Sequence, residues 1–152
     1  MKAAPGTALA VLFLGLAAGC STPFFKPKIA LRELVLDVAP DANDNSPFAL
    51  ELVATSDDAL LAKLLALTAA EWFAPQSNLK RDFRAELRTW YCEPTPGSRV
   101  PVPLADFAGK PGKGLLLFAN YKSPGAHRLR LDSFASATVV FGPDTARIDA
   151  PP

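Results

Sequence analysis

Residues 29–54 read Ile-Ala-Leu-Arg-Glu-Leu-Val-Leu-Asp-Val-Ala-Pro-Asp-Ala-Asn-Asp-Asn-Ser-Pro-Phe-Ala-Leu-Glu-Leu-Val-Ala, two apolar stretches separated by a run of turn formers. Residues 29–38 predict a strand. Its apolar residues fall on odd-numbered positions at the start and on even-numbered positions at the end, so in a regular strand the two sets would lie on opposite faces. A bulge near residues 32–33 would bring both sets of apolar side chains to one face. Residues 39–47 predict a loop, and the alternating stretch 48–54 predicts a second strand. The chain therefore opens its folded part with two strands joined by a polar loop.

The rest of the folded part predicts one short helical insertion and then further strands. Ser56-Asp57-Asp58 precedes leucines at helical spacing, and Thr68 with Glu71 fits a capping box. Further strands are predicted at 85–92, 100–104, 115–121, 127–131 and 137–141, with many of the 15 prolines between them. These features predict a mostly β fold, a two-sheet β-sandwich over residues 29–142 with a short helical insertion after the second strand. Residues 143–152 are expected to form a flexible C-terminal tail.

The N-terminus has the pattern of a lipoprotein export signal. Lys2 precedes an uncharged apolar run from Ala8 to Ala18, which is too short to cross a bilayer and ends in Gly19-Cys20. Residues 1–19 are therefore predicted to be a signal peptide, Cys20 the lipidated residue, and residues 20–28 a tether. An ordinary secretory signal cut near Ala18 is the alternative. Ser21, in place of an Asp, favours sorting to the outer membrane and its periplasmic face.

Composition and motifs argue against an enzyme, a cofactor site and nucleic-acid binding. The chain has 16 basic and 15 acidic residues, so no strong field attracts an anionic polymer. His127 is the one histidine, and Cys92 with His127 is the only nucleophilic pair available. Both are interpreted as structural residues. The stretch 41–45 is rich in oxygen ligands but lacks the Gly and Glu of a calcium-binding EF-hand, so a hydrated turn is favoured over a metal site.

A group of basic residues lies between the predicted helical insertion and the strand that follows it. It contains Lys80, Arg81, Arg84 and Arg88, with Asp82 and Glu86 interleaved. The favoured interpretation is a solvated face, and the alternative is a docking surface for an acidic partner.

The lipobox-like Leu16-Ala17-Ala18-Gly19-Cys20, the short Pro tether and the predicted sandwich together resemble a known family. It is TssJ, the small outer-membrane lipoprotein of the type VI secretion membrane complex. Further points of resemblance are the polar loop and Pro47 before the second strand, Asp82-Phe83, the Pro96-Gly97 turn and the apolar stretch 115–121. The family's apolar-Tyr-Gln-Leu stretch after the second strand is replaced here by Ala54-Thr55-Ser56.

The resemblance implies a transthyretin-like β-sandwich that acts as an adaptor at the outer membrane. It implies docking of an inner-membrane secretion protein with a large periplasmic domain through the loop between the first two strands. By position that loop is 40–47, with Asp41, Asn43, Asp44 and Asn45 as the expected partner-binding residues. No small-molecule substrate is expected. A periplasmic peptide-binding or pilotin-like lipoprotein of another envelope assembly is the alternative function.

Overall fold

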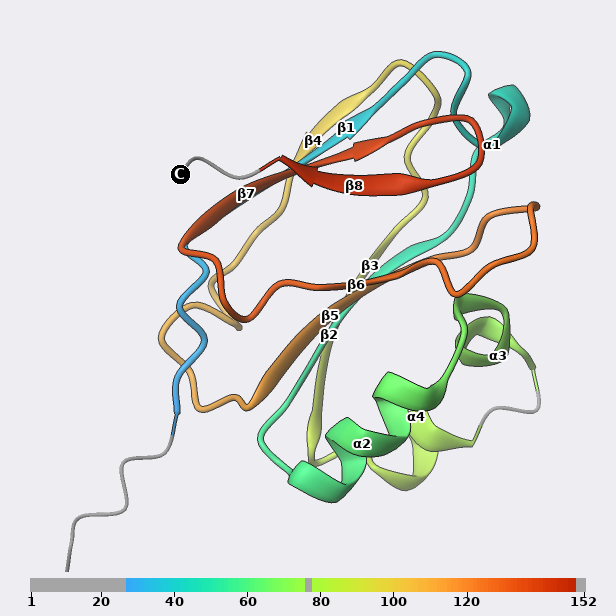
Figure 1. The fold of residues 1–152 in the computed structure, drawn as a ribbon. Helices are drawn as coiled ribbons and strands as arrows, with labels where there is room; N and C mark the ends of the chain where they lie inside the picture. Colours follow the sequence, from blue (N-terminus) through green and yellow to red (C-terminus); the bar gives the residue numbers. More distant parts are fainter. Residues whose placement is uncertain (1–26, 76–77, 150–152) are drawn as a thin grey trace, which may run out of the picture.

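The computed structural model describes residues 27–75 and 78–149 (Figure 1). Within these ranges the chain forms eight strands and four short helical segments. In chain order they are β1 (Glu33–Val38), α1 (Ala42–Asn45), β2 (Leu50–Thr55), α2 (Asp58–Ala66), α3 (Ala69–Phe73), α4 (Leu79–Asp82), β3 (Leu87–Cys92), β4 (Arg99–Pro101), β5 (Gly114–Ala119), β6 (Arg128–Arg130), β7 (Ser136–Phe141) and β8 (Ala146–Asp149).

The strands form two four-stranded sheets that lie face to face (Figure 1). One sheet has the order β4-β1-β7-β8, in which β1 and β7 run parallel and the other pairs antiparallel. The other sheet has the order β3-β2-β5-β6 and is antiparallel throughout. The predicted β-sandwich is confirmed.

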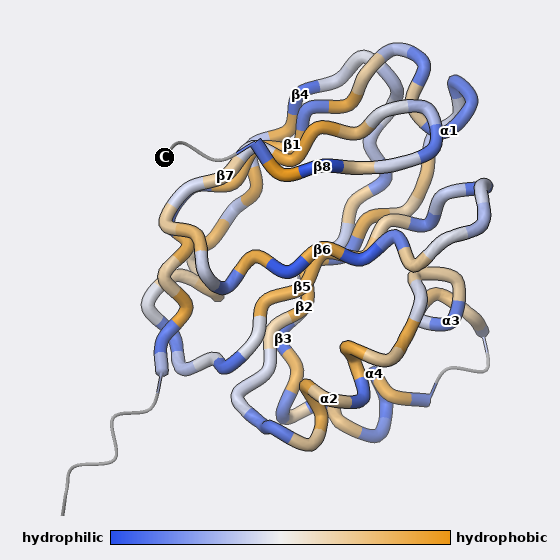
Figure 2. Tube along the Cα trace, viewed as in Figure 1, coloured by the Kyte–Doolittle hydropathy of each residue, from blue (hydrophilic) through white to orange (hydrophobic). Residues whose placement is uncertain are grey.

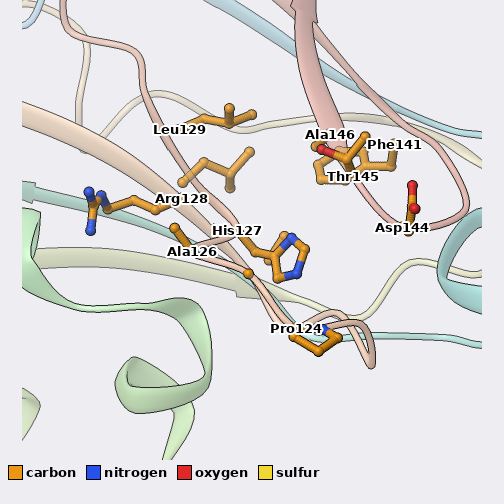
Figure 3. A pocket seen from close by; sticks show the side chains of 12 residues that line it. Pro124, Ala126, His127, Arg128, Leu129, Phe141, Asp144, Thr145 and Ala146 are labelled. Atoms are coloured by element: carbon orange, nitrogen blue, oxygen red, sulfur yellow. The ribbon is translucent and has the colours of Figure 1, made fainter.

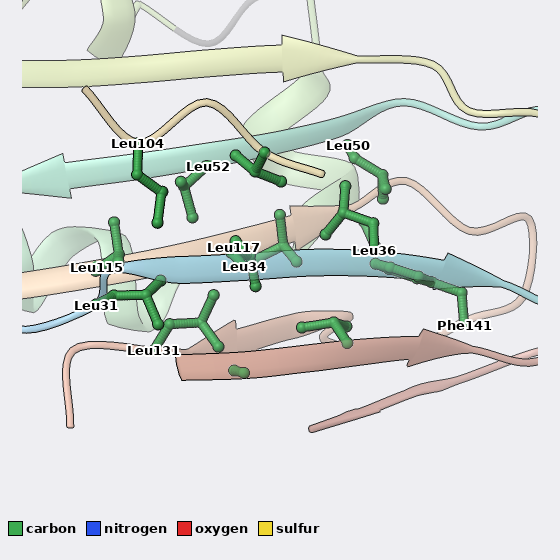
Figure 4. Packing of buried hydrophobic residues seen from close by; sticks show 14 of the residues in the cluster. Leu31, Leu34, Leu36, Leu50, Leu52, Leu104, Leu115, Leu117, Leu131 and Phe141 are labelled. Carbon is green, nitrogen blue, oxygen red and sulfur yellow. The ribbon is translucent and has the colours of Figure 1, made fainter. Parts of the chain in front are cut away.

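The main hydrophobic core fills the space between the two sheets (Figure 4). Leu34 and Leu36 of β1 lie in this core, and so do Ile29 and Leu31, which precede the strand and have the opposite parity. Arg32 lies at the change of parity, and its N–H donates to the carbonyl of Ala135 at 2.7 Å. Both sets of apolar residues therefore reach one core, as the sequence predicts.

A second core lies between the helical insertion and the outer face of the sheet that contains β2 and β5. Leu60 and Leu64 of α2 and Trp72 of α3 pack there against the two strands, and Trp72 stacks on Phe118 with ring centroids 5.1 Å apart. Because helices cover its outer face, β2 is buried on both sides. Both predicted helix starts are present: Asp57 accepts from the Leu60 N–H at 2.7 Å, and Thr68 with Glu71 forms the capping box.

Two segments differ from the sequence predictions. The tail predicted over residues 143–152 forms strand β8 at Ala146–Asp149, which pairs with β7 after a turn closed by the Gly142 N–H and the Thr145 carbonyl at 2.9 Å. Alternation of polar and apolar residues is weak there, so pairing with β7 decides the structure. Residues 79–82, for which the sequence predicts no helix, form α4. In the hydropathy view, β2 and β5 are largely hydrophobic, whereas β6 alternates (Figure 2).

The predicted signal peptide, Cys20 and most of the tether lie outside the described residues. Among the residues that are described, no helix has the length and apolar character needed to cross a membrane.

Candidate functional site

Three loops meet at one end of the sandwich, the end at which β1 finishes. They are the β1–β2 loop, the β5–β6 loop and the β7–β8 turn. The Lys122 N–H of the β5–β6 loop donates to the side-chain oxygen of Asn43 at 2.8 Å, and the Asn43 N–H donates to the Gly142 carbonyl of the β7–β8 turn at 3.4 Å. The described chain enters at the opposite end, where the Gly112 N–H donates to the Pro27 carbonyl at 2.9 Å. The three loops therefore form one surface far from the N-terminal entry (Figure 1).

The centre of this surface is α1, a single turn with an unusual backbone. Asn43, Asp44 and Asn45 have φ values of +50°, +57° and +49°, so three consecutive non-glycine residues are in the left-handed region. Asn and Asp tolerate this region better than other residues with a side chain, because their short polar groups form local hydrogen bonds. Such a conformation persists only where the surrounding structure holds it, and it is typical of functional loops.

Asn43 is the residue that holds the turn. It is 3% exposed and lies beneath the loop. Its side-chain oxygen accepts from the Lys122 N–H, and its side-chain nitrogen donates to the Ser46 carbonyl at 3.3 Å. Asn43 is one of the predicted partner-binding residues, and the structure places its side chain beneath the turn, where its two hydrogen bonds hold the loop.

The other predicted contact residues are exposed, as a docking loop requires. Asp41 and Asn45 face solvent, and the Asp44 side chain is 93% exposed. The Asp44 carboxylate lies 3.9 Å from the Lys122 ammonium, which also donates to the Ser46 hydroxyl at 2.6 Å. The four predicted residues line a shallow hollow of about 410 Å³ together with Lys122, Ser123, Pro143 and Asp144. The structure therefore brings the predicted residues together and adds residues from two other loops.

Aromatic residues support the three loops from below. The Phe48 and Tyr121 rings lie with centroids 4.8 Å apart, and Phe48 meets Phe141 edge-on at 5.7 Å. The Tyr121 hydroxyl donates towards the carbonyls of Gly142 and Thr145, at 3.2 and 2.9 Å. Burial raises the pKa of Tyr121, with Asp144 adding to the effect. The hydroxyl therefore stays protonated and ties the β7–β8 turn to the β5–β6 loop.

The Cys92 and His127 pair is separated by the fold. Cys92 lies on β3 and His127 precedes β6, at opposite edges of one sheet. The three strand spacings between these edges amount to about 14 Å. The His127 Nε2 atom lies 2.8 Å from the Ser123 carbonyl, and its ring lies 4.8 Å from that of Tyr121. Burial, followed by the charge of Glu93, raises the pKa of Cys92 to about 11, which disfavours a thiolate.

A second hollow, of about 300 Å³, lies between β6 and β8 beside His127 (Figure 3). His127 and Arg128 line one side of it, and Phe141, Asp144 and Ala146 line the other. In the described part of the chain, no three side chains of the metal-binding types gather into a cluster.

Sequence reasoning missed the residues that the other loops contribute, namely Lys122, Ser123 and Asp144. The predicted strands 115–121 and 127–131 require a connection between them, but no local pattern indicates which distant loop that connection will meet. The sequence offers an indication only for Asn43, because asparagine in a predicted loop often adopts the left-handed backbone conformation.

No protein-family model matches this sequence, and no curated protein matches it either. Solved structures do resemble it. Serratia marcescens Lip, a membrane-bound component of the type VI secretion system, has a TM-score of 0.54 and 16% identity, over 77% of this chain and 95% of Lip. The type VI secretion lipoprotein TssJ1 from Pseudomonas aeruginosa has a TM-score of 0.51 and 17% identity, over 79% of this chain and 95% of TssJ1.

A chain in the structure of the C-terminal domain of the type VI secretion protein TssM from EAEC is also similar. It has a TM-score of 0.56 and 13% identity, over 77% of this chain and 98% of that chain. At these identities the likeness shows a shared fold. The resemblance that the sequence indicates is therefore confirmed at the level of the fold: this chain has the β-sandwich of the TssJ-like type VI secretion lipoproteins.

Proposed function

We propose that this chain is a lipid-anchored structural adaptor in the membrane complex of a type VI secretion system. It docks a periplasmic partner through the β1–β2 loop and has no enzymatic role. The observation that carries the proposal is the α1 turn, where three left-handed residues are presented at the tip of the sandwich and held by the buried Asn43. A rigid, strained and exposed loop on a stable scaffold is typical of a recognition site.

The arrangement of the two ends supports an adaptor. Residues 27–29 pair with residues 109–112 at the end where the chain enters from the predicted tether. The α1 turn lies at the other end of β1, and six residues of strand span about 20 Å. A lipid on Cys20 would therefore hold the entry end near the membrane and point the loop surface into the periplasm. We place the anchor in the outer membrane on the basis of Ser21.

The proposed partner is an inner-membrane secretion protein with a large periplasmic domain. The likeness to a chain in the TssM C-terminal domain structure supports this choice. The exposed carboxylates of Asp41, Asp44 and Asp144 around the shallow hollow would favour basic side chains on the partner.

The test is co-purification of the partner from membranes. We expect deletion of residues 43–45 to abolish association. We expect Asp44→Asn to weaken it while leaving the fold intact, because asparagine tolerates the left-handed backbone at this position and Asp44 makes only an exposed ion pair. Asp106→Asn is the matched control, since Asp106 is exposed in the segment near the entry end. Undiminished association of both loop variants would refute the assignment of the loop.

The anchor has a separate test. Cys20→Ala should release the protein from the membrane fraction and abolish secretion. A variant that stays membrane-bound and active would contradict the role proposed for Cys20.

A further inference from the structure

Strand β3 is the longest free edge of the sandwich. It is the outer strand of its sheet and pairs only with β2, over all six residues. The other edge strands are shorter: β4 and β6 have three residues each, β8 has four, and β4 contains Pro101. Outside the ladder with β2, no backbone hydrogen bond is recorded within the described chain for residues 88–92. An edge of this kind presents unpaired N–H and C=O groups on which another strand can form.

The outer face of β3 is flanked by positive charge. Lys80, Arg81 and Arg84 line a hollow of about 450 Å³ that also includes Leu87 and Thr89 of the strand. Asp82 and Glu86 are interleaved with these cations in the sequence, but neither lines the hollow. The three cations form a wall beside the free edge. Arg81 in this wall is already engaged, because its guanidinium lies 3.7 Å from the Asp82 carboxylate and donates to the side-chain oxygen of Asn78 at 2.6 Å. Arg88, the fourth member of the basic group, instead donates to the Pro111 carbonyl.

A buried carboxylate fixes one side of this wall. Glu51 of β2 is 3% exposed, accepts from the Trp72 indole N–H at 3.0 Å and forms an ion pair with Lys80. The Lys80 ammonium also lies over the Trp72 ring, 4.8 Å from its centroid. These contacts hold α4 in place over the sheet. Arg84 is then the cation of the wall for which no partner is recorded within the described chain, and it is the one that can meet a ligand.

The far end of β3 offers a different contact. Leu87, Thr89 and Tyr91 share the outer face of the strand, and Tyr91 is 50% exposed. It is the one large hydrophobic side chain that is exposed among the residues the structure describes. Its hydroxyl bonds the Glu93 carboxylate. Exposed aromatic residues and arginines are the side chains most enriched at the centre of protein interfaces.

We propose that β3 receives an extended acidic peptide segment of a partner protein. The segment adds to the sheet as a further strand beside β3, places a carboxylate against Arg84, and packs an apolar side chain on Tyr91. An acidic occupant is chosen because cations line the hollow beside the edge and because a guanidinium group binds a carboxylate in bidentate geometry. This site is separate from the β1–β2 loop and does not depend on the function proposed for that loop.

The experiment uses the full-length chain in nanodiscs and a fluorescein-labelled peptide that alternates glutamate with threonine. A peptide alternating lysine with threonine is the control ligand. Binding is followed by fluorescence anisotropy, and hydrogen exchange reports the protection of the β3 amides. Arg84→Glu is the test variant. Arg147→Glu, which reverses the same charge on the edge strand β8, is its matched control.

We expect the acidic peptide to bind and the lysine peptide not to bind. Bound acidic peptide should slow hydrogen exchange within Leu87–Cys92. Its affinity should fall about tenfold with Arg84→Glu and stay unchanged with Arg147→Glu. Equal binding of the lysine peptide, or unchanged affinity of Arg84→Glu, would overturn the proposal, as would absence of binding. A further control measures hydrogen exchange without peptide in phosphatidylglycerol discs and in phosphatidylcholine discs. Protection of α4 and β3 in the phosphatidylglycerol discs only would show that the wall faces lipid, and this result would also overturn the proposal.

Discussion

Replacing Asn43 with glycine tests whether this side chain organises the loop surface. Its amide oxygen accepts from the Lys122 N–H at 2.8 Å, and its amide nitrogen donates to the Ser46 carbonyl at 3.3 Å. Glycine accepts a φ of +50° without strain, so the backbone of the turn is preserved and only the side-chain bonds are lost. Loss of the acceptor leaves a partly buried N–H without a partner, which costs about 1–3 kcal/mol.

Asn45→Gly is the matched control, because Asn45 has a φ of +49° but is exposed and makes no recorded side-chain hydrogen bond in the described chain. The entropy that glycine adds to the unfolded chain is about the same at both positions, so it cancels in the comparison. Urea unfolding followed by the fluorescence of Trp72 and Trp90 gives the two free energies. With a slope of about 2 kcal/mol per molar, Asn43→Gly should unfold roughly 1 M earlier than Asn45→Gly. Midpoints that coincide would refute the positioning role of Asn43.

Three further predictions concern the scaffold. The pKa of about 11 for Cys92, compared with an ordinary value of 9.0, leaves about a hundredth of the usual thiolate near pH 8. Alkylation of Cys92, measured by peptide mass spectrometry, should therefore be about 100-fold slower than in the urea-unfolded chain. Hydrogen bonds from the Thr68 backbone N–H, and secondly from the Thr68 hydroxyl, lower the pKa of Glu71 below 4.5. The ionised carboxylate therefore stabilises the fold above that pH. This stabilisation disappears as the pH falls through the lowered pKa. The stability difference between the wild type and Glu71→Gln should accordingly vanish in acid, and a difference independent of pH would contradict the assignment. At Gly114 a Cβ would lie 2.2 Å from Leu61 Cδ1 and 3.2 Å from Leu61 Cγ, so Gly114→Ala should force the Leu61 side chain to repack in the second core. We expect the free energy of unfolding to fall by about 1–3 kcal/mol, and a neutral effect in urea unfolding would contradict tight packing at this contact.

The strands that sequence reasoning locates best are those whose pattern is set by one buried face. In β7, alternate residues are buried and the period of two is clear. The change of parity before β1 could also be interpreted, because a shift of one position brings both apolar sets to one core. For such segments the local sequence carries the information that the fold uses.

Other features depend on contacts that a local pattern does not contain. Glu51 interrupts the apolar pattern of β2 as a surface residue would, yet the helical insertion buries it against Trp72 and Lys80. β8 forms because β7 offers an edge, although its own residues indicate a frayed tail. Tertiary context overrides local preference in both cases.

The candidate site shows the same division. The position of the β1–β2 loop follows from its turn formers, and the exposure of Asp41, Asp44 and Asn45 agrees with the prediction. The burial of Asn43 was not predictable, because it depends on Lys122, which is 79 residues away along the chain. That Lys80, Arg81 and Arg84 line one hollow beside β3 likewise becomes visible only once α4 packs over the sheet.

Site-specific photocrosslinking in intact cells tests the central claim most directly. A photoreactive benzoylphenylalanine is placed at Asp41, which is exposed beside the α1 turn and has an ordinary φ of −99°, and in a second strain at Asp106 near the entry end. The account predicts that position 41 crosslinks to the large periplasmic domain of an inner-membrane secretion protein and that position 106 does not. Crosslinking of that protein from position 106, with none from position 41, would contradict the account.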